Sequence, residues 1–177
     1  MTQQQPYALD RDRTAVVIMD YQVGIVANYA SDPDGVAQRA AAILDAARGA
    51  GVPVIYIRHG GGAFAGDRPD TAFHPAIAPQ DDEMVFVKRK TGAFSTTGLD
   101  VHLREQGRDA LVLLGVSTSG CVLSTVRAAA DLNYRVVVVK DACDDTDAEV
   151  HRVLTEKIYP RQATVVTTAE FAAAARA

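Results

Sequence analysis

Residues 110–132 read ALVLLGVSTSGCVLSTVRAAADL: an apolar run, a loop of small residues, and then a helix-like segment. The run Ala110–Leu114 is continuously apolar rather than alternating, which is typical of a strand buried on both faces of a parallel sheet. The segment Cys121–Leu132 is rich in Ala and ends near Asn133. A strand followed by a helix in this way predicts one unit of an α/β fold.

The same alternation extends over most of the chain. Short runs rich in Val, Ile and Leu predict five more strands, at Ala15–Met19, Pro53–Ile57, Met84–Val87, Arg135–Val139 and Ala163–Val166. Helices are expected at Val36–Arg48, Asp100–Gln106, Asp147–Ile158 and Glu170–Ala175, with Asp147 and Thr168 as N-caps. Because strands and helices alternate, we expect a three-layer α/β/α domain with a six-stranded, mainly parallel sheet.

Composition limits the classes of protein that fit. The chain has 177 residues, 48% of them hydrophobic and 23% charged, which predicts a single globular domain over residues 1–177 with a polar extension over residues 1–13. The net charge of −4 and the lack of a basic cluster argue against nucleic acid and against a membrane surface as partners. Two cysteines, and a start without an apolar signal segment, favour a reducing compartment and a cytoplasmic location.

Ligands of an open parallel sheet bind beyond the carboxyl ends of its strands. Asp20 follows the first predicted strand, Lys88 and Lys90 follow the third, and Cys121 follows the fourth after a loop of small residues. One carboxylate, one or two ammonium groups and a thiol are therefore expected at one edge of the sheet. The pattern alone does not say which lysine points inward.

Each of these residues also has an ordinary structural interpretation. Cys121 opens a predicted helix, where free N–H groups lower a thiol pKa, but it is equally well a small buried apolar residue. Asp20 is equally well a turn or helix cap, and Lys88 a solvated charge at a strand end. An ionised Asp20 beside a buried sheet needs a partner, and Lys88 is the expected one.

The sequence gives no pattern for a metal or a dinucleotide. It contains no His-x-His or Cys-x-x-Cys pair, and the glycines between Gly60 and Gly66 lack the G-x-G-x-x-G spacing. We therefore expect no metal and no cofactor. The stretch from Arg58 to Glu83 is long and rich in Gly, Pro and Asp, which predicts a lid or a binding loop.

Four segments together resemble the isochorismatase-like cysteine hydrolase superfamily. They are Val16–Gln22 (VVIMDYQ), Val87–Leu99 (VKRKTGAFSTTGL), Leu114–Arg127 (LGVSTSGCVLSTVR) and Arg135–Ala142 (RVVVVKDA), and they occur in the order of the family. The resemblance covers the chain from about Thr14 to Phe171, and it implies the three-layer fold and a catalytic triad of Asp20, Lys88 and Cys121. It also favours Lys88 over Lys90.

The resemblance further implies a cis peptide bond between Val116 and Ser117, and an oxyanion hole formed by the backbone N–H groups of Ser117 and Cys121. The implied activity is hydrolysis of a C–N bond in a small amide, ureido or imide substrate, through a thioester on Cys121. A homo-oligomer, either a dimer or a tetramer, is also implied. Substrate contacts are expected from Gln22, His59, Phe94 and Ser119.

Departures from the family pattern narrow this expectation. Ser119 stands where many relatives have Asp, and the resulting Ser-Thr-Ser-Gly-Cys loop is similar to that of N-carbamoylsarcosine amidases. The metal-binding pattern of nicotinamidases is absent around His59, and Cys121 argues against a vinyl-ether hydrolase. Two alternatives remain: a catalytically silent interaction protein of the same family, and a phospho-acceptor domain, for which Tyr21 stands where a second acidic residue is expected.

Overall fold

The computed structural model describes residues 7–177, so the first six residues of the expected N-terminal extension lie outside it. All the strand pairs of its six-stranded sheet are parallel, and the strand order is β3-β2-β1-β4-β5-β6. The fold class predicted from the sequence is therefore confirmed. The strands are β1 (Thr14–Met19), β2 (Val54–His59), β3 (Met84–Lys88), β4 (Ala110–Gly115), β5 (Arg135–Val139) and β6 (Thr164–Val166).

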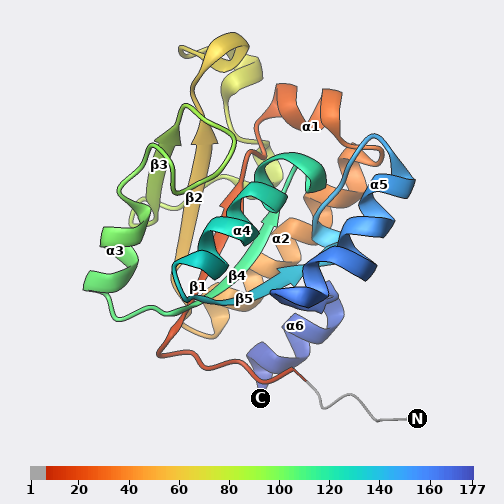
Figure 1. Cartoon of the computed structure of the whole chain (residues 1–177). Helices are drawn as coiled ribbons and strands as arrows, with labels where there is room; N and C mark the ends of the chain where they lie inside the picture. The colour runs from red at the N-terminus through yellow and green to blue at the C-terminus, as the bar shows by residue number, and fades with distance from the viewer. Residues whose placement is uncertain (1–6) are drawn as a thin grey trace.

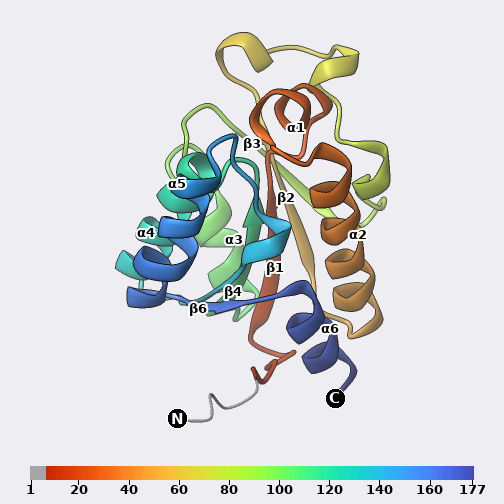
Figure 2. The same ribbon diagram turned by 90° about the vertical axis from the view of Figure 1, so that its right-hand side faces the viewer.

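Helices cover both faces of the sheet. Figure 2 shows α2 and α6 on one side and α3, α4 and α5 on the other, while α1 lies above the carboxyl ends of the strands. The helices are α1 (Val23–Tyr29), α2 (Pro33–Gly49), α3 (Leu99–Glu105), α4 (Leu123–Asp131), α5 (Ala148–Val153) and α6 (Thr168–Arg176). Among residues 7–177, no helix is long and apolar enough to cross a membrane.

Local sequence signals explain where several helices begin. The Asp32 carboxylate accepts a hydrogen bond from Gly35 N, and Pro33 occupies the first turn of α2. Asp147 caps α5 as predicted, accepting from two backbone N–H groups. The cap of α6 is Thr167 rather than Thr168, because Thr167 and Glu170 bond reciprocally to each other's backbone.

Two expectations about secondary structure were wrong. The continuous apolar run of β3 predicted a strand buried on both faces, yet Met84, Val85 and Val87 are 43%, 38% and 48% exposed because β3 forms one end of the sheet. Helix α1 was not among the expected helices: its seven residues include a glycine and three β-branched residues, and no side chain caps its start. Its burial against neighbouring elements compensates for that weak local signal.

The segment between β2 and β3 contains short helical turns instead of longer elements. Strand β2 continues through His59, two residues beyond the predicted end, and is followed by η1 (Gly62–Phe64), η2 (Pro69–Thr71) and η3 (Pro75–Ile77). Figure 1 shows this segment rising above the carboxyl ends of β2 and β3. It therefore borders the edge of the sheet at which ligands are expected.

The chain changes direction between β1 and β4. From β1 it proceeds outward through β2 to β3, and it then returns to the other side of β1 to form β4, β5 and β6. Met19 and Gly115, the last residues of β1 and β4, are register partners. The carboxyl ends of these two strands form the switch point at which a doubly wound sheet opens a crevice.

Candidate active site

Asp20 follows β1 directly and lies at this crevice. Its φ angle is +60°, in the left-handed region that Asp tolerates better than most residues, and the residue is 5% exposed. Its backbone N–H donates to Ile57 O at 2.9 Å, which ties the turn to β2. Oδ2 of the carboxylate receives a hydrogen bond from Lys88, whereas Oδ1 is buried and has no hydrogen-bond partner.

Lys88 ends β3 and reaches into the same crevice. Its side chain is 1% exposed, and Nζ lies 2.7 Å from Asp20 Oδ2, 2.6 Å from Thr91 O and 3.3 Å from Lys90 O. Lys90, the other lysine considered from the sequence, is exposed. The structure therefore places Lys88 inward, beside the carboxylate.

Cys121 lies in the π-helical turn η4 (Thr118–Val122), which leads from β4 into α4. Its Sγ lies 3.7 Å from Ser117 O, and the residue is 3% exposed. Gly115 provides the space that the sulfur occupies, because a Cβ at that position would lie 3.0 Å from Sγ and 3.0 Å from Met19 O. The thiol therefore packs at the end of β4, beside the last residue of β1.

The loop before Cys121 is held by its backbone N–H groups. Thr118 N donates to Asp144 O at 2.8 Å, Ser119 N donates to Asp145 Oδ2 at 2.8 Å, and the N–H groups of residues 120 and 122 donate to Ser117 O. The remaining N–H groups of residues 117–122 are those of Ser117 and Cys121, the two expected in an oxyanion hole. The peptide bond between Val116 and Ser117 is cis, as the resemblance implied.

Burial dominates the protonation equilibria of the site. It raises the pKa of Asp20 to about 6, although the positive charge of Lys88 and the hydrogen bond from Lys88 act in the opposite direction. Burial and the neighbouring Asp20 carboxylate raise the pKa of the Cys121 thiol well above its ordinary value. Of the two interpretations of Cys121, a thiol pKa lowered at a helix start and a small buried residue, the burial and the raised pKa favour the second for the resting thiol.

Asp20, Lys88 and Cys121 open into one cavity of about 280 Å³. Such a volume suits a small organic molecule. The other residues that line it are Ile25, Tyr29, His59, Phe64, Thr91, Val116, Ser117 and Gly120.

Of the four predicted substrate contacts, the structure places only His59 among the residues that line this cavity. Gln22 is fully buried, and its amide bonds to both backbone groups of His59 and to Thr71 O. Phe94 stacks on Tyr134 at 5.7 Å between ring centroids. The Ser119 hydroxyl donates to Asp145 Oδ2 at 2.6 Å. These three side chains support the surrounding elements instead of lining the cavity.

Sequence reasoning missed the apolar wall of the cavity and the acidic anchors of the loop. Ile25 and Tyr29 come from α1, which the sequence did not predict, and Phe64 comes from the short turn η1. Asp144 and Asp145 follow β5, and the position of adjacent acidic residues at the carboxyl edge was the available signal. Among residues 7–177, no group of three or more His, Cys, Asp or Glu side chains is arranged to hold a metal ion.

Comparison with known proteins agrees with this geometry. The family model of the isochorismatase domain matches residues 14–170. The uncharacterized isochorismatase family protein YecD of Escherichia coli O157:H7 is 36% identical over 176 residues, which covers 89% of this chain and 93% of YecD. A solved structure of an isochorismatase family protein from Burkholderia thailandensis has a TM-score of 0.87 at 31% identity, covering 98% of this chain and 100% of that one.

A parallel sheet of this strand order, with a carboxylate at the end of β1 and a thiol after β4, defines a doubly wound α/β protein with a candidate site at its switch point. The family match extends over nearly the whole of that sheet, and the chain belongs to the isochorismatase family. The family includes enzymes that act on C–N bonds, such as the ureidoacrylate amidohydrolase RutB of Agrobacterium fabrum. RutB is 28% identical over 179 residues, which covers 78% of each protein.

Proposed function

We propose that the protein hydrolyses a C–N bond of a small amide, ureido or imide substrate through a thioester on Cys121. The observation that carries the proposal is the convergence of Asp20, Lys88 and Cys121 on one cavity of about 280 Å³ at the switch point of the sheet. The amidohydrolase activity that RutB is named for supports the choice of a C–N bond. The proposal places the enzyme among the amidohydrolases that act on bonds other than peptide bonds.

Acylation begins when the Sγ of Cys121 attacks the substrate carbonyl carbon while the thiol proton passes to Asp20. The unpartnered Oδ1 is the acceptor, because Oδ2 already receives a hydrogen bond from Lys88. The N–H groups of Ser117 and Cys121 bind the developing oxyanion, and such a donor contributes roughly 3–4 kcal/mol in other enzymes. Asp20 then transfers its proton to the leaving nitrogen, the C–N bond breaks, and ammonia or an amine departs.

Deacylation uses the same carboxylate. A water molecule gives a proton to Asp20 as its oxygen attacks the thioester carbonyl. The C–S bond then breaks, and the proton returns from Asp20 to the sulfur of Cys121 as the carboxylic acid product leaves. The positive charge of Lys88 and its hydrogen bond favour the carboxylate form of Asp20.

A panel of small primary amides, carbamoyl compounds and cyclic imides, assayed for ammonia release or ring opening, tests this proposal. Cys121→Ala should abolish turnover and Asp20→Asn should lower it by orders of magnitude, with circular dichroism confirming that both variants fold. Cys143→Ala is the matched control, because Cys143 is equally buried and does not line the cavity. Turnover by Cys121→Ala would eliminate the thioester.

A further inference from the structure

The cavity has one wall made of apolar and aromatic groups. Ile25 and Tyr29 of α1 and Phe64 of η1 line the cavity. The Phe64 ring lies 6.4 Å from that of Tyr29 and 5.7 Å from that of His59, measured between ring centroids, with interplanar angles of 59° and 64°. A flat or apolar part of a ligand is favoured against such a surface.

Among residues 7–177, Lys88 is the one lysine or arginine that lines the cavity, and its N–H groups already have acceptors. An ammonium group has three donors. Those of Lys88 are directed at Asp20 Oδ2, Thr91 O and Lys90 O. Lys88 therefore offsets the charge of Asp20 and has no donor left for a second carboxylate.

His59 adds a polar group without adding charge. It is the register partner of Lys88 on the neighbouring strand, and both of its backbone groups are fixed by the Gln22 amide. Burial and the positive charge of Lys88 lower the pKa of the imidazole, so the ring is neutral at pH 7. Its Nδ1 is buried and has no hydrogen-bond partner, although the ring lines the cavity.

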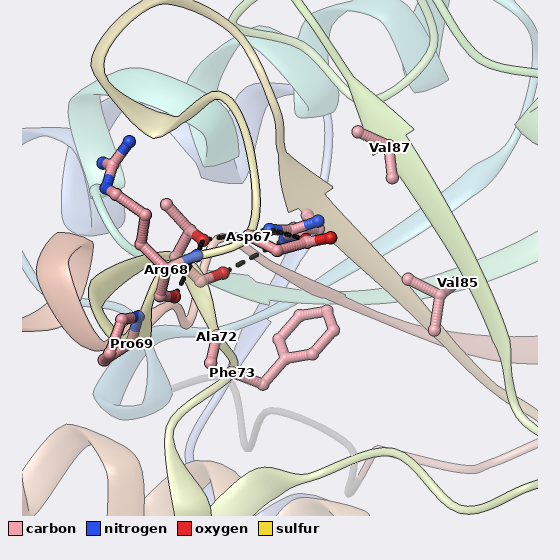
Figure 3. Close-up of a pocket in the computed structure, with 9 residues that line it drawn as sticks. Asp67, Arg68, Pro69, Ala72, Phe73, Val85 and Val87 are labelled. Atoms are coloured by element: carbon pink, nitrogen blue, oxygen red, sulfur yellow. Dashed lines mark hydrogen bonds and ion pairs between the residues drawn. The ribbon is translucent and has the colours of Figure 1, made fainter.

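The nearest arginines of the β2–β3 segment serve a different pocket. Side chains alternate between the faces of a strand, so Arg58 points away from the side on which His59 lies. Arg58 pairs with Asp67, and Arg68 pairs with Asp70. Figure 3 shows Asp67 and Arg68 around that second pocket, which is bordered by Val85 and Val87 of β3.

We propose that the substrate is an uncharged small amide with a flat apolar part, held against Phe64 and hydrogen-bonded to His59, and that amides carrying a carboxylate are excluded. This rests on the proposed function for the reacting C–N bond. A carboxylate inside the cavity would be a second negative charge beside Asp20, and no cation among the described lining residues is free to pair with it. Burying an unpaired charge costs several kcal/mol, whereas a neutral group is accommodated.

Alkylation of Cys121 by iodoacetamide and by iodoacetate tests the proposal without a known substrate. Both reagents release iodide when they alkylate the sulfur. Iodoacetamide is neutral, whereas iodoacetate is an anion. We measure the rate with iodoacetamide divided by the rate with iodoacetate, both at Cys121 and with a free small thiol. We expect this ratio to be about tenfold or more higher at Cys121, and a tenfold difference corresponds to about 1.4 kcal/mol. A Cys121 that favours iodoacetate relative to the free thiol overturns the proposal.

Substitution at the rim provides the complementary experiment. Tyr29 is 47% exposed, so Tyr29→Arg places a cation at the cavity without disturbing the core, and it should shift the ratio toward iodoacetate. Val101→Arg is the matched control, because Val101 is 60% exposed on α3 and does not line the cavity. An equal shift in both variants would show that overall charge, not the cavity, sets the preference.

His59 is tested by the concentration dependence of alkylation. His59→Leu should raise the half-saturating iodoacetamide concentration about three- to tenfold, the value of one hydrogen bond, and His59→Gln should restore part of that loss. Equal values in the wild type and both variants would remove His59 as a contact. Ammonia release from terephthalamide but not from 4-carbamoylbenzoate, a neutral and an anionic amide on the same flat ring, extends the test to turnover. If no amide is hydrolysed while the alkylation preference holds, the proposed reaction fails and the preference for neutral ligands stands.

Discussion

Lys88 Nζ donates to Asp20 Oδ2 at 2.7 Å and leaves Oδ1 of the same carboxylate without a partner. The ion pair is buried, so solvent competes little with it. One oxygen therefore orients the carboxylate and the other is free to exchange a proton with Cys121. In the mechanism that we propose, this division of roles makes the protonation state of Asp20 the quantity on which activity depends.

The pH profile should show that dependence. Because the pKa of Asp20 is raised to about 6, the carboxylate is protonated below that pH and cannot accept the thiol proton. We expect kcat/KM, or the rate of Cys121 alkylation, to be constant above pH 7 and to fall about tenfold per unit below pH 6. Asp20→Asn should lack this acidic limb. A rate that instead rises toward pH 9 would mean that the thiol ionises independently of Asp20.

Removal of the Lys88 side chain should shift the acidic limb of the pH–rate profile to higher pH. The charge and hydrogen bond of Lys88 lower the pKa of Asp20, so in Lys88→Met the pKa rises and the acidic limb shifts to higher pH. Breaking a buried pair also costs about 3–5 kcal/mol of unfolding free energy, which urea titration measures. Lys90→Met is the control, because Lys90 is exposed, and it should leave both quantities unchanged. If the acidic limb of the pH–rate profile does not shift in Lys88→Met, the titration of Asp20 does not cause that limb.

A methyl group at Gly115 should displace the thiol. The added Cβ of Gly115→Ala would lie 3.0 Å from Cys121 Sγ, 3.0 Å from Met19 O and 3.1 Å from Met19 Cβ, so the sulfur or the strand end must shift. We expect at least a tenfold loss in the alkylation rate, since small displacements of reacting groups cost up to about a hundredfold. Gly49→Ala is the matched control, because a Cβ there meets nothing within 4 Å. Equal rates in the two variants would contradict the position of the sulfur.

Asp145 and Ser119 should act as one unit. The Asp145 carboxylate accepts from both the N–H and the hydroxyl of Ser119, two residues before the nucleophile. Asp145→Ala should lower kcat more than it raises KM, because it loosens the loop without touching the substrate. Ser119→Ala should cost little in the Asp145→Ala background, as a double-mutant cycle measures. Additive effects would return Ser119 to the role of a direct substrate contact.

Much of the fold could be predicted because both faces of the central strands are buried. Strands β1 and β4 are apolar at every position except Thr14 and Gly115, and no other element type of that length accounts for such runs. The same reasoning failed for Met84, Val85 and Val87, because an apolar run does not reveal that a strand ends up at the sheet edge. Edge position is a property of the strand order, which the local sequence does not contain.

The positions of the catalytic groups followed from strand ends, but their electrostatics did not. The place of Cys121 before a helix left open whether its pKa is lowered or the residue is simply buried; the structure buries it beside Asp20, and both effects raise the pKa. Likewise, Gln22 and Ser119 are near the nucleophile or its base in sequence, yet their polar atoms bond to His59 and Asp145. Burial and long-range partners are set by tertiary packing, so sequence position alone misassigns them.

The strand order determines how the ion pair between Asp20 and Lys88 can be lost. Strands lie about 4.8 Å apart, so with β2 between them the ends of β3 and β1 are about 10 Å apart, a gap that the four-carbon stem of Lys88 helps to span. The counter-ion of Asp20 is thus anchored on the outermost strand, which carries three exposed apolar side chains. Fraying of that strand would withdraw the ammonium group while β1 and β4 stay folded. Loss of catalytic competence would then report a sub-global opening that precedes unfolding of the interior.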